Sequence, residues 1–422
     1  MEQNQISPLR NGEGQGEGSN LPLRKGAHRG PGESALMIDL CRPRRDGAAR
    51  ERIGEMLAAG AGWDGFFALA RRHGVAAIAG KALLDDFPAD APRECRDLAR
   101  QAVQGAALRG LRQMQALLGL LEKLRAGGVA AVPFKGPALS LQAYGDPGLR
   151  HFVDLDIMVR PADAAPAREL LRQAGYAPHS DIEPRQWENY LRVRKDLGFT
   201  NEPGGVLVDL NWSLAESYYA FKPQMAGWFL RAQQTDFSGK KFCAFSPEDT
   251  LLLLCQHGSV HYWQRLLWIC DVAYLLHAHP VLDWDAATGR ARECGGLRML
   301  LLGLGLAQEL LGASIPQNVA GMIGGDKAAA RLARSISQAY VNGSPREPGR
   351  LRKNALRLAL RERRRDRWGI IAQTAAALAG CEWKILNLPK SFFPAYVVLH
   401  RVGFLRDLWK GTFPLNTKTP RR

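Results

Sequence analysis

The stretch Phe134–Val159 reads FKGPALSLQAYGDPGLRHFVDLDIMV, and the rest of the chain is organised around it. Near its end, Asp154 and Asp156 alternate with the aliphatic residues of 153–159. Side chains on a β-strand point to alternate faces, so the two aspartates share one face and the aliphatic residues pack behind them. Adjacent carboxylates repel each other unless a cation lies between them, and their oxygens suit Mg²⁺ or Mn²⁺. The pair predicts a metal site for phosphoryl or nucleotidyl chemistry.

The residues before this strand predict a place for phosphate groups. Val129–Phe134 is a short apolar run, and it leads through Lys135 and Gly136 into a helix that begins at Pro137. Proline favours the first position of a helix, and glycine lets a ligand approach the backbone. A helix N-terminus offers free N–H donors, and Lys135 adds a positive charge. We therefore expect Lys135 and Gly136 to hold a triphosphate, although a lysine at a strand end is often simply solvated.

A third carboxylate is predicted on a later hairpin. Residues 197–200 and 206–212 read as two strands joined by a turn-rich connector. In the second strand, Leu207, Asp209 and Asn211 share the face opposite the apolar residues. If this hairpin lies beside the strand of Asp154 and Asp156, Asp209 completes a set of three carboxylates, as two-metal nucleotidyl transfer requires.

Several motifs together resemble the bacterial uncharacterised nucleotidyltransferase family, within the DNA polymerase β-like nucleotidyltransferase superfamily. They are F-K-G, Y-G-D-P-G-L-R, D-L-D-I-M-V, V-D-L-N-W and L-C-Q-H-G followed by H-Y-W-Q-R-L-L-W-I-C-D, spread over Leu118–Leu276. The resemblance implies that Asp154 and Asp156 bind metal, that Asp209 is the third carboxylate and that Gly136 belongs to the nucleotide loop. Two positions depart from the family pattern: Pro137 follows the glycine, and Asn211 stands where a histidine is expected.

A chain of 422 residues can bury a sizeable core and is expected to contain two or three subdomains. The N-terminal segment is rich in Gly, Glu and Arg and lacks aromatic residues, so we expect it to be disordered, with Met37 as a candidate functional start. The expected division is 1–36 disordered, 37–125 helical, 126–245 nucleotidyltransferase core, 246–343 helical and 344–422 basic and helical.

The net charge of +16 is concentrated at the C-terminal end. Residues 344–422 contain 18 Lys or Arg against 5 Asp or Glu, so a polyanion is a possible partner for this segment. The alternative is a solvated basic helix. The segment Ser391–Trp409 combines aromatic and basic residues, which is compatible with an anionic membrane surface but more typical of a helix packed on its own protein.

Seven scattered cysteines without a CxxC pair favour free thiols in a reducing cytoplasm, and no stretch of sequence predicts a transmembrane segment or a signal peptide. His257 and His261 lie four residues apart on a predicted helix that begins after a Ser246 cap. This spacing can hold zinc, but no further ligand follows at motif spacing, so packing or a substrate-facing role is the preferred interpretation.

The sequence predicts an α+β protein with a small mixed sheet surrounded by helices. The preferred function is Mg²⁺- or Mn²⁺-dependent transfer of a nucleoside monophosphate from an NTP, with ATP as the expected donor, to an unknown hydroxyl or similar acceptor. In this interpretation Asp154, Asp156 and Asp209 are catalytic metal ligands, and Arg150 contacts phosphate or substrate. The alternative is an inactive protein of the same fold that binds a peptide, nucleic acid or an anionic membrane surface, because two aspartates around a leucine are often only a solvated strand face.

Overall fold

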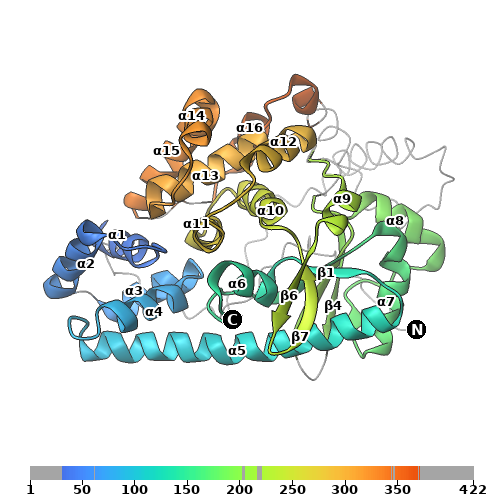
Figure 1. Ribbon diagram of the computed structural model, residues 1–422, viewed down its shortest axis with the longest axis horizontal. Helices are drawn as coiled ribbons and strands as arrows, with labels where there is room; N and C mark the ends of the chain where they lie inside the picture. Colours follow the sequence, from blue (N-terminus) through green and yellow to red (C-terminus); the bar gives the residue numbers. More distant parts are fainter. Residues whose placement is uncertain are drawn as a thin grey trace, which may run out of the picture.

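The computed structural model describes residues 31–370, apart from 61, 202–204, 216–220, 344, 346 and 369. A small mixed sheet is surrounded by helices, which confirms the expected α+β class (Figure 1). The expectations for residues 1–30 and for Ser391–Trp409 concern parts of the chain outside the described residues. No helix in the described part is long and apolar enough to cross a membrane.

The N-terminal helices begin earlier than expected. The expectation of disorder is wrong for residues 31–36, which form the first turns of a helix in which Leu36 and Met37 are buried. The Ser34 hydroxyl donates a hydrogen bond to the Gly343 carbonyl, so distant contacts hold these turns. The helices of this part are α1 (Pro31–Leu40), α2 (Gly47–Ala59), α3 (Trp63–Arg72), α4 (Ala76–Asp86) and α5 (Arg93–Ala126).

The long helix α5 runs beneath both the N-terminal helices and the sheet (Figure 1). Its first half contributes Cys95, Ala99 and Ala106 to a hydrophobic cluster that also contains the C-terminal helices. Its second half contributes residues such as Met114 and Leu117 to a separate cluster beneath the sheet. One helix therefore belongs to both cores.

The main sheet has the strand order β1-β2-β5-β4-β3, in which β2 and β5 are parallel and the other neighbours are antiparallel. Its apolar face packs on α5 and α7, and the opposite face carries the aspartates. The strands and helices of this part are β1 (Ala131–Pro133), α6 (Gly136–Tyr144), β2 (Asp154–Val159), α7 (Ala164–Gln173), β3 (Ala177–Pro178), α8 (Trp187–Val193), β4 (Asp196–Asn201), β5 (Val206–Asn211), α9 (Met225–Leu230), β6 (Gln233–Phe237) and β7 (Lys240–Ala244), the last two forming a separate hairpin.

The loop between α6 and β2 is pressed against α5. A Cβ atom at Gly110 of α5 would lie 2.2 Å from the Cα atom of Gly148, and a Cβ atom at Gly148 would lie 2.7 Å from the Cα atom of Ala107. Real Cβ atoms do not approach backbone this closely, so both positions require glycine. This contact fixes the chain just before it enters the strand that carries the aspartates.

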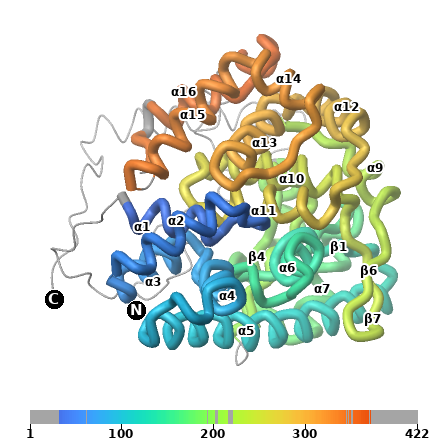
Figure 2. The backbone as a smooth tube through the Cα atoms, turned by 60° about the vertical axis from the view of Figure 1, so that its left-hand side comes forward, coloured from blue at the N-terminus to red at the C-terminus, as the bar shows by residue number. Residues whose placement is uncertain are grey.

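The C-terminal helices cover the aspartate side of the molecule. The Ser246 side chain accepts a hydrogen bond from the backbone N–H of Asp249, which confirms the predicted helix cap. Figure 2 shows α1 beside α15, and the two helices are in contact. The helices are α10 (Pro247–Val260), α11 (Leu266–Ala278), α12 (Trp284–Cys294), α13 (Leu297–Leu311), α14 (Gln317–Gly325), α15 (Lys327–Val341) and α16 (Arg350–Ala359).

Candidate active site

The three predicted carboxylates lie on one face of the sheet. Strands β2 and β5 pair in parallel with Asp156 directly beside Asp209, and Asp154 lies beside Leu207. Directly paired residues on neighbouring strands point to the same face, and β-strands lie about 4.8 Å apart. The prediction that the hairpin lies beside the strand of Asp154 and Asp156 is therefore confirmed, and so is the strand phase of Asp209.

The carboxylates perturb one another. Burial, followed by repulsion from Asp156, raises the pKa of Asp154 to about 6. Burial also raises the pKa of Asp209 to about 7, with repulsion from Asp156, Asp154 and Asp196 adding to it. Raised pKa values of this kind show negative charge that the protein itself does not fully compensate. Such sites are candidates for chemistry or for cation binding.

Lys135 and Gly136 lie at the start of α6, against β2. The Lys135 ammonium lies 3.3 Å from the Oδ1 atom of Asp156. Gly136 has a φ angle of +58°, and a Cβ atom there would lie 3.1 Å from the Asp154 carbonyl oxygen. Glycine is needed for this close approach of α6 to the strand. The lysine therefore reaches the carboxylate face, while the glycine brings the helix N-terminus next to it.

Arg150 does not serve as an exposed phosphate contact. It is 5% exposed, and its guanidinium donates two hydrogen bonds to Asp271, from Nε at 2.8 Å and from Nη2 at 2.9 Å. The Tyr144 hydroxyl donates a third to the same carboxylate at 2.8 Å. The expected phosphate role is therefore wrong for this arrangement. Arg150 instead joins the loop before β2 to α11, and its charge still lowers the pKa of Asp154, against the larger effect of burial.

The carboxylates fit a hard divalent cation by their chemistry. Their oxygens are the ligands that Mg²⁺ prefers, and the raised pKa values of Asp154 and Asp209 would be relieved by positive charge. Among the described residues, however, no three His, Cys, Asp or Glu side chains are placed so that they could hold one ion. Sharing an ion would therefore require the side chains to turn from their present positions. The same finding leaves the zinc interpretation of His257 and His261 without a third described ligand.

A cavity of about 90 Å³ lies between this face of the sheet and α10. Lys195 lies just before β4, and its ammonium contacts Asp196 at 2.6 Å. No sequence signal pointed to Lys195, because its position depends on a hairpin packing against a helix far along the chain. The cavity is lined by Phe134, Lys135, Lys195, Asn211, Leu214, Leu253, Gln256, His257, Val260 and His261.

His179 is a second residue that sequence reasoning missed. It follows β3, and its ring lies over Gly198 of β4, which pairs with Asp209. A Cβ atom at Gly198 would lie 2.5 Å from the Nδ1 atom of His179 and 3.3 Å from the Oδ1 atom of Asp209. The Nε2 atom of His179 is 2.5 Å from the hydroxyl oxygen of Thr200. The glycine thus makes room for an imidazole beside the third carboxylate.

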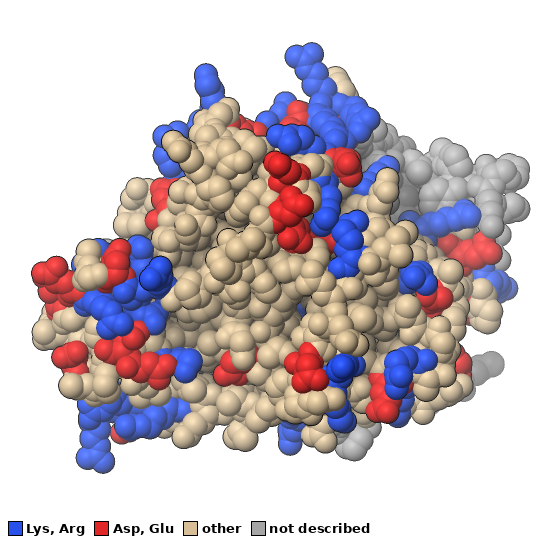
Figure 3. Space-filling model, viewed as in Figure 1, with Lys and Arg blue, Asp and Glu red and all other residues tan. Residues whose placement is uncertain are grey.

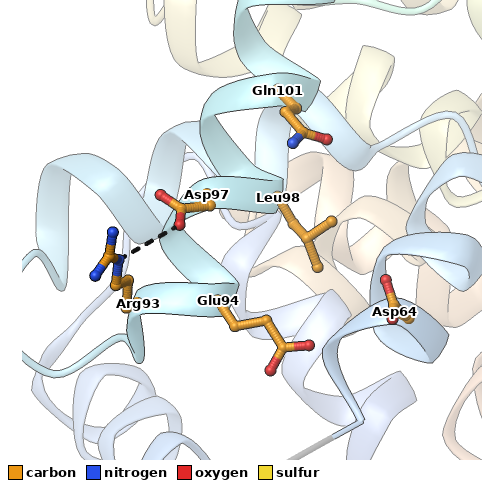
Figure 4. A pocket seen from close by; sticks show the side chains of 6 residues that line it. All are labelled: Asp64, Arg93, Glu94, Asp97, Leu98 and Gln101. Carbon is orange, nitrogen blue, oxygen red and sulfur yellow. Dashed lines mark ion pairs between the residues drawn. The ribbon is translucent and has the colours of Figure 1, made fainter.

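A larger, shallow hollow of about 510 Å³ lies elsewhere, between α3 and the start of α5 (Figure 4). Its charged side chains are exposed, and Arg93 lies 3.9 Å from Asp97. It is lined by Asp64, Arg93, Glu94, Asp97, Leu98 and Gln101. None of these residues comes from the sheet, so this hollow does not share the candidate active site.

Comparison with known proteins gives one family. A comparison with curated proteins found no match. The model of the family described as uncharacterised nucleotidyltransferase matches residues 59–312, which is more than half of the chain and includes both aspartate strands and α10. The chain belongs to this uncharacterised nucleotidyltransferase family, which supports a general nucleotidyltransferase role.

Proposed function

We propose that the protein transfers a nucleoside monophosphate from an NTP, with ATP as the first donor to test, to a hydroxyl or similar acceptor in the presence of Mg²⁺. The observation that carries this proposal is the register of β2 and β5, which sets Asp156 beside Asp209 with Asp154 on the same face. In the reaction, the acceptor oxygen forms a bond to the α-phosphorus, the bond from that phosphorus to the bridging oxygen breaks, and pyrophosphate leaves.

The residues of the chain divide the work of this reaction. A bound Mg²⁺ supplies positive charge that polarises the phosphate oxygens and acidifies the attacking hydroxyl. Asp154 and Asp156 would hold the ion, and Asp209 would either join them or accept the proton of the acceptor. Burial raises the pKa of Asp209 above its usual value, which favours its acceptance of a proton. Lys135 and the start of α6 at Gly136 would contact the triphosphate.

The test is NTP consumption with Mg²⁺ by the wild type and by Asp154→Asn, Asp156→Asn and Asp209→Asn. Each labelled NTP is offered with panels of sugars, peptides and RNA as acceptors. Asparagine keeps the volume but removes a charged ligand, so turnover should fall by orders of magnitude while the protein stays folded. Asp90→Asn, at an exposed position in the N-terminal part, is the matched control and should retain activity. Wild-type turnover in the Asp154 and Asp156 variants would contradict the proposal.

A second candidate is a binding protein that has kept the fold without the chemistry. It is favoured by the contact between Lys135 and Asp156. The ammonium places a positive charge beside that carboxylate, where a metal ion would otherwise supply it. This candidate predicts that no NTP is consumed with Mg²⁺ or Mn²⁺, whichever acceptor is offered. Metal-dependent release of pyrophosphate by the wild type, lost in Asp156→Asn, would exclude it.

A further inference from the structure

The cavity between the sheet and α10 is lined by basic, neutral polar and apolar residues. None of the ten described residues that line it is acidic, and two of them are lysines. Lys135 and Lys195 each contact a carboxylate of the sheet, Asp156 and Asp196 respectively, and both also border the cavity. A cavity of about 90 Å³ has room for several water molecules, and so for a small anionic group. The lining itself therefore offers positive charge and hydrogen-bond donors to an anion, and both lysines are at the same time paired with carboxylates of the sheet.

Two histidines of α10 complete the lining. The rings of His257 and His261 are 4.6 Å apart, and both contact the ring of Trp268. Burial, followed by the charge of Lys135, lowers the pKa of His261 to about 4, and the same two causes lower the pKa of His257 well below its usual value. The lowered pKa values favour the neutral form of both rings, and among the described residues no hydrogen bond is made to their ring nitrogens. Both side chains are half-buried and border the cavity, so a ligand there would supply hydrogen-bond partners to these nitrogens.

The turn after α10 has an unusual backbone conformation at two large residues. Tyr262 and Trp263 both have positive φ angles, 55° and 53°, which are unusual for residues with large side chains. The Trp263 ring fills a notch at Gly258, where a Cβ atom would lie 2.4 Å from it, and the Tyr340 hydroxyl donates to the Trp263 carbonyl at 2.7 Å. A strained backbone conformation persists only where contacts with the surrounding structure hold it in place, and such conformations are common at functional sites. The turn fixes the end of α10 that carries His261.

We propose that this cavity receives the phosphate groups of the nucleotide donor, with Lys135 and Lys195 as cationic contacts and with His257 and His261 as hydrogen-bond donors. The assignment of this anion to the donor rests on the proposed function. The lysines border both the cavity and the carboxylate face, so an anion held here lies next to the carboxylates. The two histidines of the Q-H-G and H-Y-W motifs thus acquire a role in binding rather than in packing alone.

The test measures binding of inorganic tripolyphosphate by isothermal titration calorimetry in EDTA, so that no metal site takes part. Relative to the wild type, the variants His261→Gln and His257→Gln/His261→Gln should bind at least tenfold more weakly, and so should Lys195→Gln. His277→Gln, an exposed histidine on α11, is the matched control and should bind as the wild type does. Asp156→Asn, which frees Lys135 from its carboxylate, should bind at least as tightly as the wild type. Melting curves verify that each variant is folded.

Wild-type affinity in both the double histidine variant and Lys195→Gln would overturn the proposal, since neither side of the cavity would then contact the anion. ATP should displace tripolyphosphate. Failure of ATP to displace it, together with equally strong binding of orthophosphate, would assign the anion to another molecule and overturn the link to the donor. Failure of the proposed function is a separate result, because it would show as absent NTP consumption with Mg²⁺ while tripolyphosphate still binds in EDTA.

Discussion

The contribution of Asp154 and Asp209 to the free energy of unfolding depends on pH. Their pKa values of about 6 and about 7 exceed the usual 3.8, so the folded protein holds these protons more tightly than the unfolded chain does. Their stabilising contribution is complete below about pH 4. It is lost as the pH rises through 6 and 7, and each unit of raised pKa corresponds to about 1.4 kcal/mol. In the absence of metal, these two groups therefore make the protein less stable at pH 8 than at pH 5.

The first prediction follows from this sign. In EDTA, Asp209→Asn should have a higher melting temperature than the wild type at pH 8, because it removes a repelled charge, and the difference should shrink as the pH falls and vanish near pH 4. The measurement is a series of melting curves from pH 4 to 8.5, with Asp90→Asn as the control that follows the wild type. Adding Mg²⁺ at pH 8 should raise the melting temperature of the wild type more than that of Asp209→Asn. A difference that is independent of pH would show that the Asp209 charge is already compensated.

At the scale of elements, the crossing of α5 with the loop before β2 gives the second prediction. Gly148→Ala would press a Cβ atom against the backbone of α5, which cannot move aside as a flexible side chain could. Overpacking of this kind costs about 1–3 kcal/mol, so the free energy of unfolding should fall by at least this amount. Gly119→Ala, also on α5 but with no atom within 4 Å of the new Cβ, is the control. It should leave stability unchanged or raise it, because alanine favours helix. Urea unfolding of both variants measures the contrast.

The sequence predicted those elements whose pattern lies in neighbouring residues. The strand phase of Asp209 follows from a period of two, and the start of α10 follows from Ser246 and the proline after it. The partner of Arg150 could not be predicted in this way, because Asp271 is 121 residues away and only the packing of α11 brings it close. Lys195 was missed for the same reason. The cavity exists only where the hairpin and α10 meet, so no single motif describes it.

At the scale of the molecule, the third prediction concerns the N-terminal helix. A chain that begins at Pro31 and one that begins at Met37 differ by six residues, and these include the buried Leu36 and Ser34, which donates to the Gly343 carbonyl. Burial of a leucine side chain contributes roughly 2 kcal/mol, so the shorter chain should melt several degrees lower. Scanning calorimetry of both chains measures this. Equal melting temperatures would mean that the first turns of α1 contribute nothing to stability.

The fourth prediction concerns the basic C-terminal part. Basic side chains gather over the C-terminal helices at the top of the face in Figure 3. Arg363 donates to the Arg292 and Glu293 carbonyls at the end of α12, whereas Arg364 and Arg365 are exposed. If this surface binds a polyanion, Arg364→Gln/Arg365→Gln should weaken binding to a DNA duplex and reduce its salt slope by about 1 for each phosphate that the variant no longer neutralises. Melting curves should show no loss of stability, in contrast to Arg363→Gln. Unchanged affinity would leave the two arginines as solvated residues.

The helix α5 makes the two hydrophobic clusters a single thermodynamic unit. Because it is buried in both, it cannot unfold from one cluster without exposing apolar surface in the other. The chain should therefore melt in one cooperative calorimetric transition, and two separate transitions would contradict this. Because α5 joins the two clusters, a ligand that binds to one of them also stabilises elements that pack on the other. Tripolyphosphate bound beneath α10 should slow amide hydrogen exchange in α4, a helix that packs along α5 and contributes no residue to the cavity.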